Sequence, residues 1–526
     1  NMSVKITNVL LLDNVDPSAK KVLEENGIKA TLSKEKFTPD ALIKELQQYD
    51  GVVVRSATKI TSEIIENCPK LSIIGRAGTG VDNVDVKFAT KKGVIVMNTP
   101  GGNTLSAAEH TCTLVCCLAR NVPAADASVK AGKWDRKAFM GHELFGKTLG
   151  IVGLGRIGRE AATRMQSFGM TTIGFDPIVS KEEAAKSNIE WMTLDEMWPL
   201  CDYITVHTPL IPQTKGLLND TSFAKCKKGV RVINCARGGI IDEEALLRAL
   251  ESGQCGGAGL DVYVEEPPTN IALVRHPKVI SCPHLGASTT EAQTRCGREI
   301  AEQFVNVSKG TDFFGVLNAP ALSQAASTDM KPWISVATNL GKVVQAFMKN
   351  TAVTTLYTQG ANLSKSGKCL EAALCAGLLC SNSSSVNLIN AASISSDLGV
   401  NVTVKQDEVK PGSKHSYCRL EAKCETMTLS LLGMVFEHTP LLVSINNQPL
   451  SPALQFNDNL LIYKGEPSSL PNTIAIGVLS QSGEVKSLSS TSVQGGSRWF
   501  AITTAQAVSK DAISKIYSEN VASISF

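Results

Sequence analysis

The sequence predicts an α/β protein with two doubly wound lobes, followed by an α+β domain and a small C-terminal module. Three observations support this fold class. Short apolar runs alternate with helical patterns from residue 7 to about 99, the alternation resumes behind a glycine-rich turn at about 148, and charges become sparse after about 319. With 526 residues, the chain is long enough for three or four domains.

Residues 1–99 form the first predicted lobe, in which strands alternate with helices. We expect strands in the apolar runs 9–12, 51–54 and 72–75, and a helix over 39–49, where apolar residues recur at helical spacing. Because β-α units of this kind build a mostly parallel sheet, the lobe is predicted to be an open sheet covered by helices.

A longer helix is predicted over residues 105–121, and an apolar segment follows it. Trp134, Phe139 and Met140 lie in that segment. An apolar excursion of this kind either packs on a partner subunit or covers the sheet of its own chain, and we expect one of these two roles.

The second predicted lobe begins with a strand, a glycine-rich turn and a helix at residues 148–168. Five further β-branched runs follow and predict a doubly wound sheet of six strands; they lie at 171–176, 203–209, 229–239, 256–268 and 278–286. We assign residues 100–285 to this domain.

Gly153, Gly155 and Gly158 form a G-x-G-x-x-G pattern between that first strand and its helix. The first glycine permits the tight turn, the second lets the backbone approach a pyrophosphate, and the third lets helix and strand pack closely. This arrangement is Rossmann-like, although a purely structural turn is the alternative.

Asp176 ends the next predicted strand, close to the spacing of about 20 residues expected for the acid that binds a dinucleotide ribose. An aspartate at this position would bond the ribose hydroxyls and repel a 2′-phosphate. We therefore expect the cofactor NAD rather than NADP, although Lys181 lies nearby in the sequence.

Arg237, Glu266 and His284 each follow a predicted strand of this sheet, so all three are expected at the edge where ligands bind. Arg237 offers a planar cation for a carboxylate. His284 can exchange the proton of a 2-hydroxyl group, and Glu266 can orient the imidazole and raise its pKa. The alternatives are a surface salt bridge, a loop charge and a buried structural histidine.

Charge and hydropathy exclude two classes of partner. Lys and Arg number 52 against 49 Asp and Glu, the net charge is +3, and only 5% of residues are aromatic, so we expect no nucleic-acid partner. No apolar run reaches 18 residues, so we expect no membrane span. The expected partner is a small molecule.

The fifteen cysteines are an odd number without paired spacing, and the N-terminal residues lack the pattern of a secretion signal. We therefore expect free thiols and a cytoplasmic location. Cys112, Cys116 and Cys117 lie in the predicted helix as small apolar residues, and no histidine has ligand spacing, so no metal site is expected.

The last seventy residues predict the order β-α-β-β-α-β, which is the ferredoxin-like pattern. The expected elements are strands at 460–465, 485–493, 498–504 and 521–526, and helices at 470–482 and 510–520. A small module of this kind is more often regulatory or oligomerising than catalytic.

Six motifs resemble the D-2-hydroxyacid dehydrogenases. They are GRAGTGVDNVD (75–85), NTPGGNTLSAAEH (98–110), GLGRIGRE (153–160), VINCARGGIIDE (232–243), DVYVEEPP (261–268) and CPHLGASTTEAQ (282–293). The resemblance is dense over about residues 5–318. It is closest to the long-form members, which carry two further C-terminal domains and use NAD to oxidise 3-phospho-D-glycerate in the first step of L-serine biosynthesis.

The resemblance implies a domain plan and a homodimer or homotetramer. Residues 1–99, completed by about 286–318, would bind substrate, and 100–285 would bind NAD. Residues 319–455 would form an intervening domain, and 456–526 an ACT-like regulatory domain.

The resemblance also implies roles for individual residues. Arg237, Glu266 and His284 match the catalytic positions. The positions that match NAD contacts are Thr79, Gly153, Gly155, Arg156, Ile157, Gly158, Asp176, Thr208, Cys235 and Asp261. The positions that match substrate contacts are Arg55, Ser56, Arg76, Gly78, Asn103 and, reaching a neighbouring subunit, Arg136.

Two other functions are compatible with the same motifs. One is a reductase acting on glyoxylate or hydroxypyruvate, which normally lacks the long C-terminal extension. The other is an NAD-gated corepressor-like binding protein that retains the three catalytic residues. Fold alone does not separate these possibilities.

Overall fold

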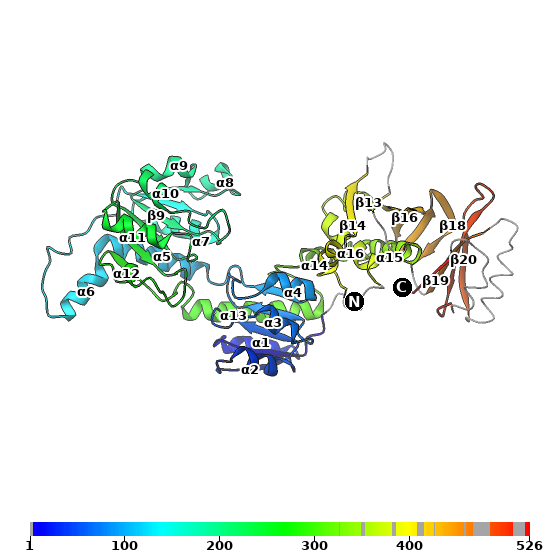
Figure 1. Ribbon diagram of the computed structural model, residues 1–526, viewed down its shortest axis with the longest axis horizontal. Helices are drawn as coiled ribbons and strands as arrows, with labels where there is room; N and C mark the ends of the chain where they lie inside the picture. The colour runs from blue at the N-terminus through cyan, green and yellow to red at the C-terminus, as the bar shows by residue number, and fades with distance from the viewer. Residues whose placement is uncertain are drawn as a thin grey trace.

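The computed structural model describes most of the chain: residues 4–325, 327–348, 353–380, 386–407, 415–425, 427–456, 459–465, 484–508 and 521–525. The molecule is elongated (Figure 1). The first lobe lies in the middle, with the second lobe on one side of it and the C-terminal domains on the other. In the described residues, no helix combines the length and hydropathy that a membrane span requires.

The first lobe contains a parallel five-stranded sheet in the order β2-β1-β3-β4-β5. Its strands are β1 (Asn8–Leu11), β2 (Lys29–Leu32), β3 (Gly51–Val54), β4 (Ile73–Arg76) and β5 (Ile95–Asn98). Its helices are α1 (Pro17–Glu25), α2 (Pro39–Leu46), α3 (Ser62–Glu66) and α4 (Val86–Lys92). The strands are short, and β3 and β5 bury every residue because helices cover both faces.

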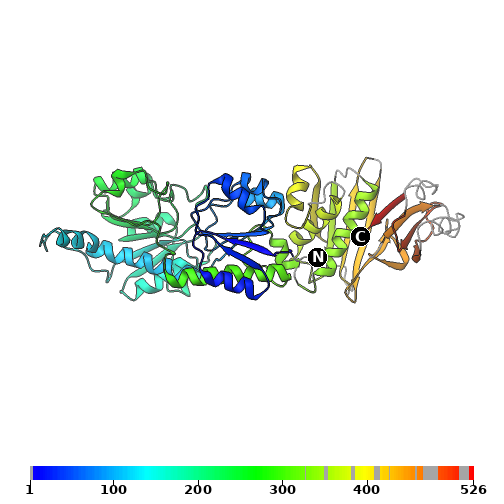
Figure 2. The same cartoon turned by 90° about the horizontal axis from the view of Figure 1, so that it is seen from below.

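A later segment of the chain completes the core of this lobe. Helix α13 (Thr290–Lys309) packs against α1 and runs along the lobe (Figure 2). The ring of Phe304 fills the space that Gly51 and Gly75 leave on the sheet. Val316 then forms a bridge with Met97 of β5. The first lobe is therefore discontinuous in sequence.

The second lobe contains a parallel seven-stranded sheet in the order β12-β11-β10-β9-β6-β7-β8. Its strands are β6 (Thr148–Val152), β7 (Thr171–Phe175), β8 (Glu190–Trp191), β9 (Tyr203–Val206), β10 (Val230–Asn234), β11 (Cys255–Leu260) and β12 (Val279–Ser281). Its helices include α7 (Arg156–Gln166), α8 (Lys181–Ala185), α9 (Leu194–Met197), the 3-10 helix η1 (Trp198–Leu200), α10 (Asp220–Lys225), α11 (Glu243–Glu251) and α12 (Ile271–Val274).

Two details of the predicted second sheet were wrong. The sheet has seven strands rather than six, because the two-residue edge strand β8 is too short to show a periodic pattern. Strand β11 also ends at Leu260, whereas the apolar run continues to Val264. Val262 and Tyr263 are buried in a loop, so their apolar character reflects core packing rather than a strand.

Helix α5 (Thr104–Arg120) crosses from the first lobe to the second and packs on α7. It is followed by α6 (Val122–Lys130), which buries none of its residues. Trp134 and Met140 beyond it are 82% and 79% exposed. We call the segment from α6 to Met140 the arm. It projects from the second lobe in Figure 1, so it does not cover the sheet of its own chain.

The C-terminal half contains a ten-stranded sheet in the order β14-β13-β15-β16-β17-β18-β20-β21-β19-β22. Six strands belong to the intervening domain: β13 (Val353–Gln359), β14 (Asn401–Gln406), β15 (Tyr417–Lys423), β16 (Thr428–Phe436), β17 (Thr439–Ile445) and β18 (Gln448–Gln455). Its helices are α14 (Pro320–Ala325), α15 (Lys331–Phe347), α16 (Gly367–Leu378) and α17 (Ala391–Asp397).

The final module contributes β19 (Asn459–Gly465), β20 (Val485–Ser490), β21 (Arg498–Thr504) and β22 (Val521–Ser525). Their order β20-β21-β19-β22, with every neighbouring pair antiparallel, agrees with the predicted ferredoxin-like strand arrangement. The helices predicted at 470–482 and 510–520 lie outside the described residues. One bridge, Ser451 with Ser490, joins this module to the intervening domain, so a single sheet runs through both.

Close packing of α15 on α16 holds the intervening domain together. Gly341 and Gly377 face each other there, and a Cβ atom on Gly377 would overlap the carbonyl oxygen of Thr338. We expect Gly377→Val to force the helices apart and to lower the free energy of unfolding by about 1–3 kcal/mol.

Thermal unfolding followed by calorimetry checks this expectation. Gly367→Ala in the same helix is the matched control, because the nearest atom to a Cβ there is 4.0 Å away. Equal unfolding temperatures for the two variants would contradict the packing argument.

Candidate active site

The candidate site lies between the two lobes, at the carboxyl edges of both sheets. Arg237 follows β10 of the second lobe, and its Nε donates a hydrogen bond of 2.7 Å to Oδ2 of Asp82 in the first lobe. Gly80 has no side chain at this point, and a Cβ atom on it would overlap the Arg237 guanidinium. The arginine therefore bridges the lobes.

Two further arginines come from the first lobe. Arg76 ends β4, and its guanidinium folds against Gly78, whose φ of 147° is open only to glycine. Burial, together with the nearby charges of Arg237 and Arg55, lowers the pKa of Arg76 to about 10. Its buried Nε has no hydrogen-bond partner. This concentration of positive charge favours an anionic ligand.

His284 and Glu266 form the pair that the sequence predicts. Nδ1 of His284 lies 2.8 Å from Oε2 of Glu266. Burial by itself would raise the pKa of Glu266, but the hydrogen bond and charge of His284 outweigh burial and leave that pKa below its usual value. Glu266 is therefore ionised at neutral pH, and its charge can orient and stabilise an imidazolium.

The loops that carry these residues lie side by side. Gly238 follows Arg237, and a Cβ atom on it would overlap the carbonyl oxygen of Tyr263, just before Glu266. The Tyr263 amide in turn donates a hydrogen bond of 3.3 Å to Oε1 of Glu266. The structure thus brings Arg237, Glu266 and His284 to one edge.

The backbone of His284 has a φ of 57°, in the left-handed region, which costs a residue with a side chain roughly 1–2 kcal/mol. The fully buried carboxylate of Asp261 holds this turn. It accepts hydrogen bonds of 2.7 and 2.8 Å from the amides of Leu285 and Gly286, while the Asp261 carbonyl accepts one of 2.9 Å from His284.

His110 is a residue that the sequence reasoning missed. Its Nε2 lies 3.1 Å from Oδ1 of Asp261. The nearby carboxylate of Asp261, with a smaller effect of the Cys282 thiol, raises the pKa of His110 from 6.5 to about 9, so the imidazole is charged at neutral pH. Its helical spacing from the buried Ser106 and Ala107 on α5 is the one sequence signal that indicates an inward-facing side chain.

His110, Cys235 and Asp261 place one ligand atom each within 4.8 Å of one another, which is close enough for a shared metal ion. Burial raises the pKa of the Cys235 thiol, and the His110 imidazole holds a proton. Because a metal ligand must be deprotonated, this grouping suits an ion pair better than a metal site.

The glycine-rich turn has the geometry that a dinucleotide needs. Gly153 has a φ of 98°, a Cβ atom on Gly158 would overlap the Gly153 carbonyl, and a Cβ atom on Gly155 would have no neighbour within 4 Å. Gly155 caps α7 without a side-chain hydrogen bond, so the first amides of the helix face this open space.

The surrounding polar groups fit the same ligand. Oδ2 of Asp176 accepts a hydrogen bond of 2.9 Å from the Leu154 amide, and Oδ1 accepts one of 2.8 Å from Ile178, which holds the carboxylate beside the turn. The buried hydroxyl of Thr208 has no hydrogen-bond partner. Thr79 is held in the first lobe by a hydrogen bond of 2.6 Å to Asn103.

One predicted site residue is not brought to this edge. Arg136 is exposed in the segment that follows α6, and α6 lies at the end of the second lobe that faces away from the first lobe (Figure 1). It is therefore not positioned to reach the cleft of its own chain.

Comparisons with known proteins agree with this geometry. Residues 112–286 match the NAD binding domain of D-isomer specific 2-hydroxyacid dehydrogenases, and residues 329–446 match the intervening domain of D-3-phosphoglycerate dehydrogenase. The chain is 50% identical over 504 residues to D-3-phosphoglycerate dehydrogenase from Homo sapiens, covering 94% of each protein. The chain belongs to the D-3-phosphoglycerate dehydrogenase family.

Other relatives match smaller shares of the chain. The family member from Bacillus subtilis (strain 168) is 45% identical over 370 residues, or 70% of each chain. A glyoxylate reductase from Paecilomyes thermophila has a TM-score of 0.54 at 28% identity and covers 60% of this chain and 98% of its own.

A D-lactate dehydrogenase from Aquifex aeolicus, solved with NAD and lactic acid, has a TM-score of 0.51 at 27% identity. It covers 58% of this chain and 96% of its own. The chain is accordingly an NAD-dependent dehydrogenase that acts on a small molecule. The glyoxylate reductase resembles only part of the present chain.

Removing the charge of Glu266 tests the pair with His284. In Glu266→Gln the imidazolium that would form during oxidation loses its negative neighbour, so kcat for NAD reduction should fall by about tenfold, which corresponds to about 1.4 kcal/mol of lost transition-state stabilisation. Steady-state rates of NAD reduction check this. Glu265→Gln, at the adjacent exposed position, is the matched control. An unchanged kcat in Glu266→Gln would contradict the proposed pairing.

Loss of the His110 charge should make the second lobe less stable in alkaline solution. Its folded pKa of about 9 lies above the ordinary value of 6.5, so its protonation contributes stability below pH 6.5 that is lost as the pH rises through about 9. We expect wild type to lose on the order of 2 kcal/mol more than His110→Gln over that range.

Scanning calorimetry near pH 6.5 and near pH 9 measures this difference in stability. His438→Gln serves as the control, since His438 is exposed in the intervening domain. An equal loss of stability in wild type and His110→Gln would refute the ion pair.

Proposed function

We propose that this chain oxidises 3-phospho-D-glycerate to 3-phosphooxypyruvate with NAD, the first step of L-serine biosynthesis. The observation that carries the proposal is the group of three arginines, Arg55, Arg76 and Arg237, whose charges interact beside the His284–Glu266 pair. A substrate with both a carboxylate and a phosphate needs more cations than glyoxylate or lactate, and guanidinium groups bind both anions in two places.

Arg237 would bind the substrate carboxylate and polarise the carbonyl group that forms at C2. Asp82 orients the Arg237 side chain through Nε, and Nη1 donates a hydrogen bond of 2.6 Å to the Ala236 carbonyl, so Nη2 is the nitrogen that would meet a ligand first. Arg55, Arg76 and the amides of the Gly78 turn would hold the rest of the substrate, with Ser56 and Asn103 as neutral partners.

His284 would accept the proton of the 2-hydroxyl group at its Nε2, because Nδ1 is engaged with Glu266. Glu266 would stabilise the imidazolium that forms. NAD, when bound, accepts the hydride from C2. Because the oxidation releases a proton, a higher pH favours it.

The remaining predicted contacts would position NAD. The α7 amides and Gly155 would face the pyrophosphate, Asp176 would bond the adenosine ribose, and the Thr208 hydroxyl would gain the partner that it lacks. Arg156, Ile157, Cys235 and Asp261 complete the NAD set, together with Thr79 from the first lobe.

The exposed segment from α6 to Met140 supports a homodimer or homotetramer, and the proposed location is the cytoplasm. Helix α6 with Trp134 and Met140 presents an unburied apolar surface that a second copy would cover, bringing Arg136 to a neighbouring cleft. The ferredoxin-like strand order supports an ACT-like regulatory role for the last module. No nucleic acid and no membrane takes part.

Formation of NADH from 3-phospho-D-glycerate, but not from D-glycerate, tests the reaction and the arginine-lined site together. His284→Ala should lower kcat by about 10² to 10⁴ while the affinity for NAD changes little, because the residue exchanges a proton and does not hold the cofactor. Near-normal turnover in His284→Ala would overturn its role. NAD binding without turnover of either acid by wild type would instead favour a corepressor-like binding protein.

A further inference from the structure

We propose that the second lobe contains an anion site at the amino edge of its sheet, opposite the edge that would bind NAD, and that this site takes a small doubly charged oxyanion such as inorganic phosphate. The site is a cavity of about 260 Å³. Clefts for drug-sized ligands usually measure about 300–1,000 Å³, so this volume suits an ion better than a larger organic molecule.

The topology of the sheet brings the cavity together from four neighbouring strands. Lys147 immediately precedes β6, Tyr203 begins β9, Arg231 is the second residue of β10, and Gly256 is the second residue of β11. Because these strands are parallel and adjacent, their amino ends meet at one edge.

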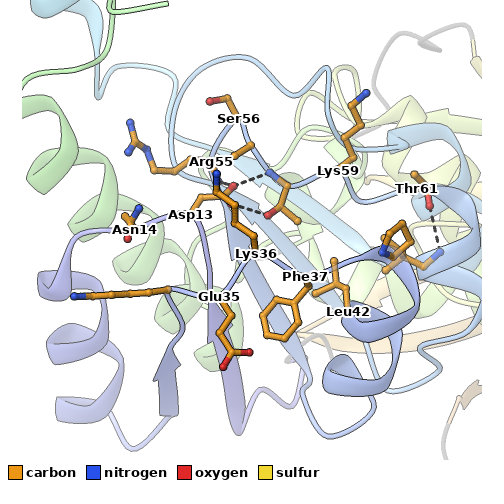
Figure 3. A pocket seen from close by; sticks show the side chains of 15 residues that line it. Asp13, Asn14, Glu35, Lys36, Phe37, Leu42, Arg55, Ser56, Lys59 and Thr61 are labelled. Carbon is orange, nitrogen blue, oxygen red and sulfur yellow. Dashed lines mark hydrogen bonds between the residues drawn. The ribbon is translucent and has the colours of Figure 1, made fainter. Parts of the chain in front are cut away.

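This edge is separate from the candidate active site. Arg237 and the glycine-rich turn follow strands of the same sheet, so they lie at the opposite, carboxyl edge. The five residues of β10, at about 3.3 Å each, separate the two edges by roughly 16 Å. The predicted substrate residues Arg55 and Ser56 line a pocket of the first lobe (Figure 3), whereas the described residues that line the new cavity all belong to the second lobe.

The lining of the cavity carries more positive than negative charge. Lys147, Lys228 and Arg231 line it, and none of the three forms an ion pair with a residue that the structure describes. Lys227 is a further cation of the lining, and it is paired with Asp202.

Asp202 is an acid of the cavity, but its carboxylate is already engaged. Its Oδ1 accepts a hydrogen bond of 2.6 Å from Nζ of Lys227, and its Oδ2 accepts one of 3.0 Å from the Thr148 amide. Burial by itself would raise the pKa of Asp202, but these two partners outweigh burial and leave that pKa below its usual value. One acid therefore balances Lys227, and the charges of Lys147, Lys228 and Arg231 remain for a ligand.

His142 reports the positive potential of the cavity that it lines. The nearby charge of Arg231, with smaller effects of burial and of Lys147, lowers the pKa of His142 below its usual value. The cations of two different strands therefore act on the same point. An anion bound between them would relieve their mutual repulsion.

Tyr203 adds a buried polar group to the lining. Its side chain is buried, its hydroxyl has no hydrogen-bond partner among the described residues, and the guanidinium of Arg231 lies over its ring at 5.6 Å from the centroid. A buried hydroxyl without a partner is unfavourable. An oxyanion in the cavity would give this donor an acceptor, while the ring holds Arg231 in place.

The walls leave little room for a carbon body on the ligand. Gly256 packs so closely on the turn before β10 that a Cβ atom on it would overlap the Gly229 carbonyl oxygen. A compact oxyanion with two charges accepts hydrogen bonds from a guanidinium and from ammonium groups at the same time. This chemistry favours inorganic phosphate over a singly charged carboxylate.

Titration calorimetry with inorganic phosphate tests the site on the full chain, at constant ionic strength and with saturating NAD to occupy the glycine-rich turn. Wild type should bind phosphate. Lys147→Gln and Lys228→Gln, which alter two different loops, should each bind it about tenfold more weakly, the effect of losing one charge-assisted hydrogen bond. Lys70→Gln is the matched control, because Lys70 is exposed before β4 of the first lobe.

Arg76→Gln separates this site from the cleft between the lobes, and it should keep the binding of phosphate. Two results would overturn the proposal. One is equal affinity of wild type, Lys147→Gln and Lys228→Gln for phosphate, including no binding by any of them. The other is loss of binding in Arg76→Gln with retention in Lys228→Gln, which would place the ion in the cleft. Lys228 is exposed, so its variant should fold as wild type does.

Discussion

The buried carboxylate of Asp261 is the interaction on which the active edge depends. It lies at the end of β11, accepts the amides of Leu285 and Gly286, and faces the charged imidazole of His110. Burying the carboxylate without these partners would lower the stability of the fold. The left-handed turn at His284 would also lose the hydrogen bonds that support it. The orientation of His284 toward Glu266 therefore depends on a residue whose carboxylate bonds to neither of their side chains.

Clustered positive charge is the second constraint. Arg55, Arg76 and Arg237 lie close enough to lower the pKa of Arg76, and Asp82 is the acid that bonds Arg237 across the lobes. Like charges at this separation repel, so the arrangement gains stability when an anion binds between them.

The C-terminal half is built as a continuous structure beyond the two lobes. One sheet runs through the intervening domain and the last module, and α15 packs on its strands. Lys91 of the first lobe forms an ion pair of 2.8 Å with Asp397 of the intervening domain. The lobes and the extension therefore meet through a polar contact and through Leu388 and Ile389, which pack against the core of the first lobe.

The sequence by itself determined the two parallel lobes, the glycine-rich turn, Asp176 and the trio Arg237, Glu266 and His284. These follow from short-range patterns, since a strand, a turn and a helix are neighbours in the chain, and parallel strands bring their carboxyl ends to one edge. Only the tertiary structure decided the partnership of His110 with Asp261, the extent of the shared C-terminal sheet and the cationic cavity beside Arg231. Each depends on which surfaces meet after folding, and periodicity indicates that a side chain is buried without indicating what it contacts.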